Sequence, residues 1–239
     1  MTVLYSTGGQ VATITLNRPD ARNALNDAMC EDLRRVATEA AADSNIRLVF
    51  VRGSGPVFCA GADVKERTGM SVDWVRARRM KAFAAYHALE ALPMPVVAVV
   101  HGVALGSGVE IAAACDFIVA TPEAMFGTPE ALRGTVGATQ RLPRVLGKRL
   151  AKDMMFTGRR LTATEAQAAG FVARVVPADK VDHELANISQ AVLVASVDAI
   201  RWAKQCIDRG VELDPLGALG LELMAIEAQL ASGKGMGKA

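Results

Sequence analysis

The sequence predicts an α/β domain followed by a mainly helical C-terminal region. Through the first 120 residues, short runs rich in β-branched residues alternate with segments whose apolar residues recur at helical spacing. Such alternation is typical of layered α/β domains. After Gly134 the pattern changes, and predicted helices dominate the rest of the chain. With 239 residues, 51% of them hydrophobic, the chain is long and apolar enough for one large packed domain.

Strands and helices alternate regularly in the N-terminal part. The predicted strands are residues 11–16, 47–52, 96–100 and 116–120. The predicted helices are residues 26–42, 71–91 and 109–114. Asn26 or Asp27 can cap the first helix, and Pro93 and Pro95 end the second. A Gly-rich turn at 102–108 joins the third strand to the third helix.

The C-terminal part is predicted to be helical with one short strand at residues 172–176. Its helices are expected at residues 148–157, 162–169, 178–189, 197–210 and 215–231. No repeat, linker or low-complexity tract interrupts them. We therefore expect an α/β core over residues 1–190 and a separate helical region over 191–239.

Charge and cysteine usage exclude several classes of protein. A net charge of +2, from 27 basic and 25 acidic residues, gives no general attraction to nucleic acid or to an anionic membrane. We expect no signal peptide and no membrane span, because no long apolar run occurs. The four cysteines form no CxxC pair and the three histidines no metal-site spacing, so we expect reduced thiols, no metal and a cytoplasmic location.

Two turns made of small residues are candidates for a ligand site. One is residues 58–65, just beyond a strand, and the other is residues 102–110, which lead into a helix. Small residues let a ligand approach the backbone closely, and free N–H groups at a helix N-terminus favour negative charge. Two such N–H groups directed at one oxygen would form an oxyanion hole. Taken singly, each segment is equally compatible with an ordinary tight turn.

Glu110 and Glu130 are the candidate acid–base groups. Glu110 opens an Ala-rich apolar helix, where a buried carboxyl group has a raised pKa suited to proton transfer. Its structural alternative is a favourable interaction with the helix dipole. Glu130 alone is compatible with an ordinary loop carboxylate. Residue spacing does not show whether the two meet.

The helix expected at 71–91 carries four basic side chains. They are Arg76, Arg78, Arg79 and Lys81. We interpret them as a solvated helix face, with phosphate binding as the alternative.

Several of these segments, in this order, resemble the crotonase superfamily, also called the enoyl-CoA hydratase/isomerase family. The resembling segments are residues 17–26, 58–65, 102–110, 126–130, 139–142 and 156–158. The likeness extends from about Leu16 to about Leu230. It implies a spiral of ββα units with a C-terminal helical trimerisation region, hence a homotrimer or a dimer of trimers.

The resemblance also implies roles for individual residues. Ala62 and Ser107 match the positions whose N–H groups form the oxyanion hole, and Glu110 and Glu130 match the two catalytic glutamates. The positions that match the acyl-CoA contacts are Arg22, Ala24, Ala60, Asp63, Val64 and Gly106. Two departures occur: Ser107 stands where many relatives have glycine, and residues 134–139 form a shorter segment than in typical hydratases.

The expected reaction is hydration of a 2-enoyl-CoA. Glu110 would activate water and Glu130 would protonate the α-carbon, with no metal or redox cofactor because CoA is part of the substrate. Two alternatives remain: a Δ3,Δ2-enoyl-CoA isomerase on the same scaffold, which needs one carboxylate, and a weakly catalytic RNA-binding member. The low net charge argues against the RNA-binding alternative.

Overall fold

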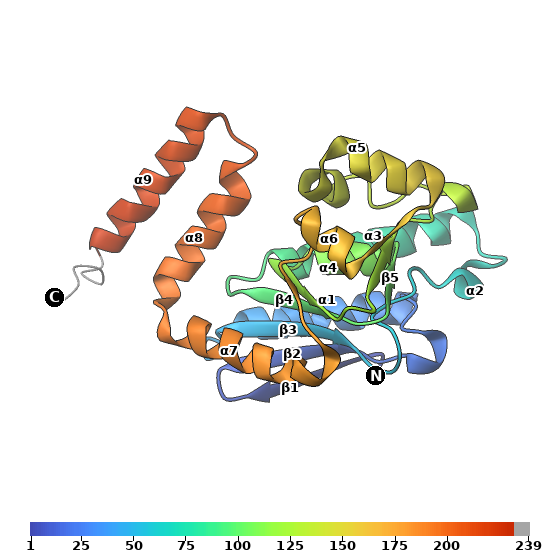
Figure 1. Ribbon diagram of the computed structural model, residues 1–239, viewed down its shortest axis with the longest axis horizontal. Coiled ribbons are helices and arrows are strands. Elements are labelled where there is room, and N and C mark those ends of the chain that lie inside the picture. Colours follow the sequence, from blue (N-terminus) through green and yellow to red (C-terminus); the bar gives the residue numbers. More distant parts are fainter. Residues whose placement is uncertain (232–239) are drawn as a thin grey trace.

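The computed structural model describes residues 1–231, which fold around two β-sheets (Figure 1). The larger sheet has the order β1-β2-β3-β4-β6-β9. Its strands are β1 (Val3–Gly8), β2 (Val11–Leu16), β3 (Leu48–Gly53), β4 (Val96–Val100), β6 (Phe117–Ala120) and β9 (Arg174–Val175). β1 pairs antiparallel with β2, and every later pair is parallel. Parallel neighbours need crossover connections, which explains the helices between them.

The two faces of the larger sheet bury different helices. Alternate residues of a strand point to opposite faces. One face, which includes Ile14, Val51 and Ala98, packs in the main core with α1 (Asp27–Ala42) and α3 (Val72–Glu90). The other face packs on α7 (Val181–Val194), whose buried residues recur at helical spacing. The residues of this second core are Leu48, Phe50, Val97, Val99, Val119, Val181, Leu185 and Ile188.

A small second sheet supports the middle of the chain. It consists of β5 (Val103–Leu105), β7 (Met125–Gly127) and β8 (Arg160–Thr162), in that order. The helices in this part are α4 (Ser107–Ala113), α5 (Arg141–Thr157) and α6 (Ala163–Ala168). Leu105 and Gly127 pair in this sheet just before α4 begins, so the small sheet fixes where that helix starts.

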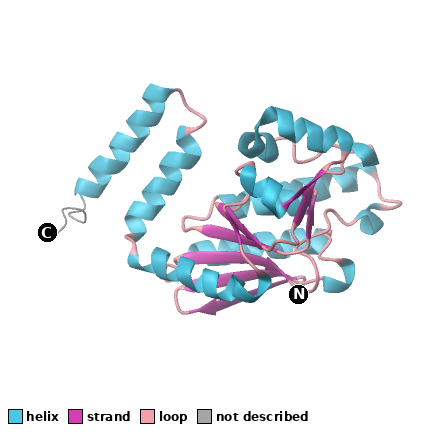
Figure 2. Ribbon diagram, in the orientation of Figure 1, coloured by secondary structure: helices cyan, strands magenta, loops and turns pink. Residues whose placement is uncertain are grey.

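The last two helices form a hairpin that extends away from the sheets (Figure 2). They are α8 (Val197–Gly210) and α9 (Pro215–Ala231), and they pack on each other. Large apolar side chains remain exposed on the hairpin, among them Val211, Leu216 and Met224. No helix within residues 1–231 is long and apolar enough to cross a membrane.

Most long elements agree with the sequence prediction, and the differences have local causes. The helix expected at 148–157 begins at Arg141 instead, with a break at Gly147, whose φ of 73° is not helical. The expected Gly-rich turn contains β5, and α4 begins at Ser107 rather than at residue 109. The strand expected at 172–176 is reduced to Arg174–Val175. The division at residue 190 stays a prediction, and residues 232–239 of its second part lie outside the described residues.

Candidate active site

One cavity brings together most of the site residues expected from the sequence. They are Ala60, Ala62, Val64, Gly106, Ser107, Glu110 and Glu130. Most of the remaining wall comes from α3 and from the segment 133–137. Segments far apart in the chain therefore converge, which the spacing of the residues alone did not show.

The turn before α2 (Val64–Arg67) is fixed on both sides by backbone hydrogen bonds. Cys59 forms a parallel bridge with Ala104, and Ala62 forms one with Leu25. In the second bridge, the N–H of Leu25 donates to the carbonyl of Gly61, and the carbonyl of Leu25 accepts from the N–H of Asp63. The N–H of Ala62 therefore points away from Leu25, and Ala62 itself lines the cavity.

Ser107 is the first residue of α4, so its N–H has no partner within the helix. Gly106 before it has a φ of 49°, a conformation that favours glycine. A Cβ at Gly108 would lie 2.5 Å from the carbonyl oxygen of Cys59, so only glycine allows the two turns to approach this closely. The two glycines therefore bring the N-terminus of α4 next to the turn that carries Ala62.

Glu110 lies on α4 with 8% of its surface exposed. Burial raises the pKa of its carboxyl group above the usual range, because a desolvated carboxylate is costly, and nearby Glu130 raises it further. The Arg141 guanidinium and the N–H of Ala138 lower it. The net result is a carboxyl group whose pKa is raised, as is common for groups that transfer protons in active sites.

Glu130 follows β7 and begins a short 3-10 turn at Ala131–Arg133. The turn is closed by the N–H groups of Arg133 and Thr135, which donate to the Glu130 carbonyl at 3.0 and 2.9 Å. Burial raises the pKa of the Glu130 carboxyl, while its own N–H and Arg133 lower it. Among residues 1–231, its buried Oε2 has no hydrogen-bond partner, which favours the uncharged acid.

Two further residues lie near Glu110, and the sequence analysis did not identify either as part of the site. Tyr86 on α3 is 1% exposed and lines the cavity. The Arg141 guanidinium lies over the Tyr86 ring, 5.7 Å from its centroid, and pairs with Glu90 at 2.8 Å. Neither residue belongs to a small-residue turn. Arg141 lies in the resembling segment 139–142, but the resemblance assigned it no role.

The prediction that the four basic side chains of α3 form a solvated face is wrong for two of them. Arg78 and Arg79 line the cavity rather than facing only solvent, and Arg79 donates to the carbonyl of Val136 at 2.7 Å. Arg76 and Lys81 do lie outside the cavity lining, in ion pairs with neighbouring acidic residues. Helical periodicity could not separate these two groups, because the cavity covers only part of that face.

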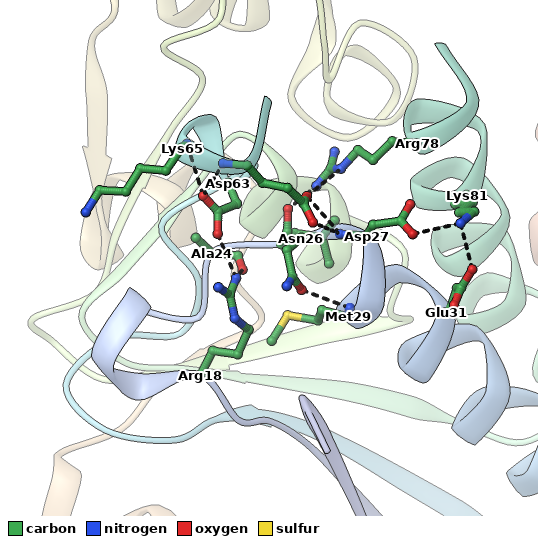
Figure 3. A network of polar contacts seen from close by, with 12 residues as sticks. Arg18, Ala24, Asn26, Asp27, Met29, Glu31, Asp63, Lys65, Arg78 and Lys81 are labelled. Carbon is green, nitrogen blue, oxygen red and sulfur yellow. Dashed lines mark hydrogen bonds and ion pairs between the residues drawn. The ribbon is translucent and has the colours of Figure 1, made fainter. Parts of the chain in front are cut away.

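Three of the expected contact residues lie beside the cavity rather than in its wall, and their interactions are structural. Asp63 caps α2 through the N–H groups of Lys65 and Glu66, and it accepts from Arg18 at 2.9 Å (Figure 3). Arg18 also donates to the carbonyl of Ala24 at 2.5 Å. The carbonyl of Arg22 accepts from the N–H of Ala60. These contacts hold the turn that carries Ala62.

The part of the chain that the structure describes contains no group of three or more His, Cys, Asp or Glu side chains arranged to hold a metal ion. All four cysteines are free thiols, as expected, and Cys30 and Cys59 are buried.

Comparison with known proteins identifies relatives of the whole chain. A family model described as enoyl-CoA hydratase/isomerase matches residues 6–234. The mitochondrial enoyl-CoA hydratase domain-containing protein 2 of Bos taurus is 40% identical over 220 residues, which cover 89% of this chain and 74% of that protein.

The comparison with solved structures finds proteins of the same family. The crystal structure of an enoyl-CoA hydratase from Bacillus anthracis has a TM-score of 0.93 and 35% identity, covering 97% of this chain and 92% of that one. An enoyl-CoA hydratase from Mycobacterium smegmatis has a TM-score of 0.92 and 31% identity, covering 96% and 91%.

Proposed function

Since this chain belongs to the enoyl-CoA hydratase/isomerase family of the crotonase superfamily, we propose that it adds water across the double bond of a 2-enoyl-CoA. The observation that carries the proposal is the convergence of two glutamates, Glu110 buried and Glu130 half-buried, both with raised pKa, beside one helix N-terminus. Hydration needs a base for water and an acid for the α-carbon, and two carboxyl groups in different protonation states supply both.

The environments of the two glutamates support a division of roles. Burial raises the pKa of Glu110, and the positive charge of Arg141 opposes that rise, which suits a general base. Burial also raises the pKa of Glu130, and its Oε2 has no hydrogen-bond partner among the described residues, which suits a general acid. In the proposed reaction, Glu110 takes a proton from water as the oxygen bonds to the β-carbon. The π-electron pair moves toward the thioester, and Glu130 gives its proton to the α-carbon.

The negative charge that develops on the thioester oxygen needs stabilisation. We assign this role to the N–H groups of Ala62 and Ser107, which belong to the two turns that meet at the cavity. One such donor typically contributes about 3–4 kcal/mol to the transition state. Ala60, Val64 and Gly106, also in the cavity wall, would contact the acyl-CoA. Arg22, Ala24 and Asp63 would act at the edge of the cavity or by holding the turn that carries Ala62. No metal or redox cofactor takes part in this scheme, because CoA belongs to the substrate.

The test is the loss of conjugated-thioester absorbance when purified protein is added to crotonyl-CoA. Wild-type protein should consume it, and Glu110→Gln and Glu130→Gln should each lower the rate about 100-fold or more. Glu123→Gln is the matched control, because Glu123 is exposed and outside the cavity lining. If folded wild-type protein binds CoA but leaves crotonyl-CoA unchanged, the proposal is wrong. Conversion of a 3-enoyl-CoA would then support the isomerase alternative, which needs only one carboxylate.

We also propose that the protein is a homotrimer or a dimer of trimers in the cytoplasm. Exposed apolar side chains on α8 and α9 support assembly, since a monomer would leave Val211 and Leu216 about four-fifths exposed, at 78% and 80%. Free thiols on all four cysteines support a reducing compartment. Light scattering on the purified protein tests the assembly, and a monomer at micromolar concentration would contradict it.

A further inference from the structure

We propose that the acyl end of the cavity binds a carboxylate, so that the preferred substrate is a short 2-enoyl-CoA whose acyl chain ends in a second carboxyl group. The inference rests on the proposed function and narrows its substrate class. It starts from the charges in the cavity wall, where arginines outnumber the glutamates two to one. The four arginines are Arg67, Arg78, Arg79 and Arg133.

Arg79 on α3 lies at the end of the cavity that holds the glutamates. Its Nη1 donates to the carbonyl of Val136 at 2.7 Å. The next residue, Gly137, packs on Glu130, since a Cβ there would lie 3.1 Å from Cγ of that glutamate. The bond to Val136 uses one donor of a guanidinium fork that presents several. The half-buried Arg79 can therefore also bind a ligand oxygen beside Glu130.

Arg133 reaches the same end of the cavity from a different element. It follows Glu130 by three residues, and its N–H donates to the Glu130 carbonyl at 3.0 Å. Its side chain lines the cavity and is exposed to solvent. The charges of Arg79 and Arg133 both lower the pKa of Glu130, which agrees with these positions. Two cationic groups that approach one place from different elements form a site for a carboxylate.

The other two arginines lie elsewhere in the wall. Arg78 donates to the carbonyl of Leu25, and its Nε lies 4.0 Å from Oε2 of Glu66. Arg67 is the last residue of α2, the helix that follows the turn carrying Ala62. That turn is the side to which the CoA part of the substrate is assigned. Arg79 and Arg133 are therefore the pair that belongs to the acyl end.

The proposed oxyanion hole sets the direction of the substrate. With the thioester oxygen at the N–H groups of Ala62 and Ser107, the sulfur and the CoA run along the turn that includes Val64. The α- and β-carbons extend the other way, to the two glutamates. Atoms beyond the β-carbon then continue toward Arg79 and Arg133.

A carboxylate suits this end of the cavity better than an alkyl group. Pockets for alkyl chains are lined by apolar side chains, and guanidinium groups facing a methyl group would lose hydration without compensation. A carboxylate would instead accept charge-assisted hydrogen bonds from them. Ala82, Phe83 and Tyr86, also in the wall, can cover the carbons of the chain.

The size of the cavity favours a short chain. Its volume is about 90 Å³, less than the cavity of about 150 Å³ that accommodates benzene in another protein. We therefore place the second carboxylate one or two carbons beyond the double bond. Glutaconyl-CoA, a five-carbon enedioyl thioester, is the probe of this class.

Binding of saturated analogues tests the inference without turnover. Glutaryl-CoA carries the distal carboxylate, and glutaramyl-CoA has the same shape with a neutral amide in its place. Titration calorimetry should show about 10- to 100-fold tighter binding of glutaryl-CoA, the size typical of hydrogen bonds to charged groups. The preference should shrink as salt concentration rises. Equal affinities at low salt would overturn the inference.

Arginine variants locate the preference. The double variant Arg79→Met/Arg133→Met should bind the two analogues equally, and each single variant should lose part of the preference. Arg76→Met is the matched control, because Arg76 lies on the same helix, 70% exposed and outside the cavity wall. It should keep the full preference. A general defect in folding or in CoA binding cancels in the ratio of the two affinities. A double variant that keeps the wild-type ratio would overturn the inference.

Turnover separates this inference from the proposed reaction. Wild-type protein should hydrate glutaconyl-CoA with a kcat/KM about 10- to 100-fold higher than that for its distal amide, and the product should gain the mass of one water. If crotonyl-CoA is hydrated but the two analogues bind equally, only the inference is wrong. If neither crotonyl-CoA nor glutaconyl-CoA is hydrated while glutaryl-CoA is still preferred, the proposed reaction is wrong and the carboxylate site stands.

Discussion

The backbone of Gly106 lies directly against the carboxyl group of Glu130, and a methyl group added to Gly106 would overlap Oε1 of that glutamate. The Glu130 side chain is also packed close to Gly137, where a Cβ would lie 3.1 Å from Cγ. The Glu130 side chain is therefore packed against two glycines. Its position depends on the absence of side chains there.

Replacing Gly106 by alanine should displace Glu130 and lower activity about 100-fold, as removal of an acid–base group does. It should also destabilise the protein, because alanine at a φ of 49° costs about 1–2 kcal/mol and the overlap adds about 1–3 kcal/mol. Steady-state kinetics and urea denaturation measure the two effects. Gly134→Ala is the control: its φ is 65°, but no atom lies within 4 Å of the added Cβ. It should lose stability without losing activity, and equal kinetic losses in both variants would contradict the prediction.

The stability of the protein should depend on pH through Glu110. Burial raises the folded-state pKa of this glutamate above its unfolded value, so at pH values between the two the folded state binds more protons than the unfolded state. The unfolding free energy therefore falls as pH rises through that interval. Above the folded-state pKa it falls no further, because Glu110 is then a carboxylate in both states.

Glu110→Gln removes the cost of the buried carboxylate. The variant should be more stable than wild type at pH 8 by about 1 kcal/mol, while losing activity. The difference should disappear near pH 4, where the carboxyl group is protonated in both states. Thermal melting at the two pH values measures this, with Glu123→Gln as the exposed control. A variant less stable than wild type at pH 8 would show that the carboxylate is favourably held.

Asp63 is expected to act through the turn that it caps. Asp63→Ala removes the cap of α2 and the ion pair with Arg18, and it should cost about 1–2 kcal/mol. Asp63→Asn keeps an oxygen that can cap the helix and should recover most of that loss. Asp73→Ala is the control, because the Asp73 side chain is 89% exposed in its ion pair. If Asp63→Asn and Asp63→Ala raise the KM for an acyl-CoA equally without any loss of stability, the carboxylate contacts the ligand instead.

Arg47 should be essential for the packing of α7. Its guanidinium donates to the carbonyls of Val192, Leu193 and Ala195, at 3.3, 2.7 and 2.5 Å, where that helix ends. Because hydrogen bonds from a charged group contribute about 1.5–3 kcal/mol, Arg47→Gln should lower the unfolding free energy by that order. Amide hydrogen exchange should also become faster along α7.

A matched control for Arg47 is Arg52→Gln. Arg52 forms a 3.7 Å ion pair with Asp182, whose side chain is 89% exposed, so the loss should stay below about 1 kcal/mol. Similar losses in the two arginine variants would contradict the role assigned to Arg47.

The sequence predicted the long elements well because their periodicity is strong. The boundaries of β4, α8 and α9 agree with the expected residues, since proline, serine and glycine delimit them clearly. The three-residue strands β5, β7 and β8 were missed. So short a strand shows no period, and it exists only because a partner elsewhere in the chain supplies its hydrogen bonds.

The site was predictable in its parts but not in its assembly. Small-residue turns marked the regions of Ala62 and Ser107, and apolar surroundings marked Glu110 as a buried carboxyl group. Tyr86 and Arg141 could not be found in this way. The two residues meet through a contact between α3 and α5, which no local pattern encodes.

The bridge between Cys59 and Ala104 also has a consequence for protein synthesis. The turn that carries Ala62 leaves the ribosome about 45 residues before its β5 partner, a delay of roughly 2–9 s at about 5–20 residues per second. During this delay the cavity of the nascent chain is incomplete, and Cys59 is not yet buried. Chaperones can bind the nascent chain in that period. Slowing translation between these two segments should increase misfolding more than slowing it after residue 140.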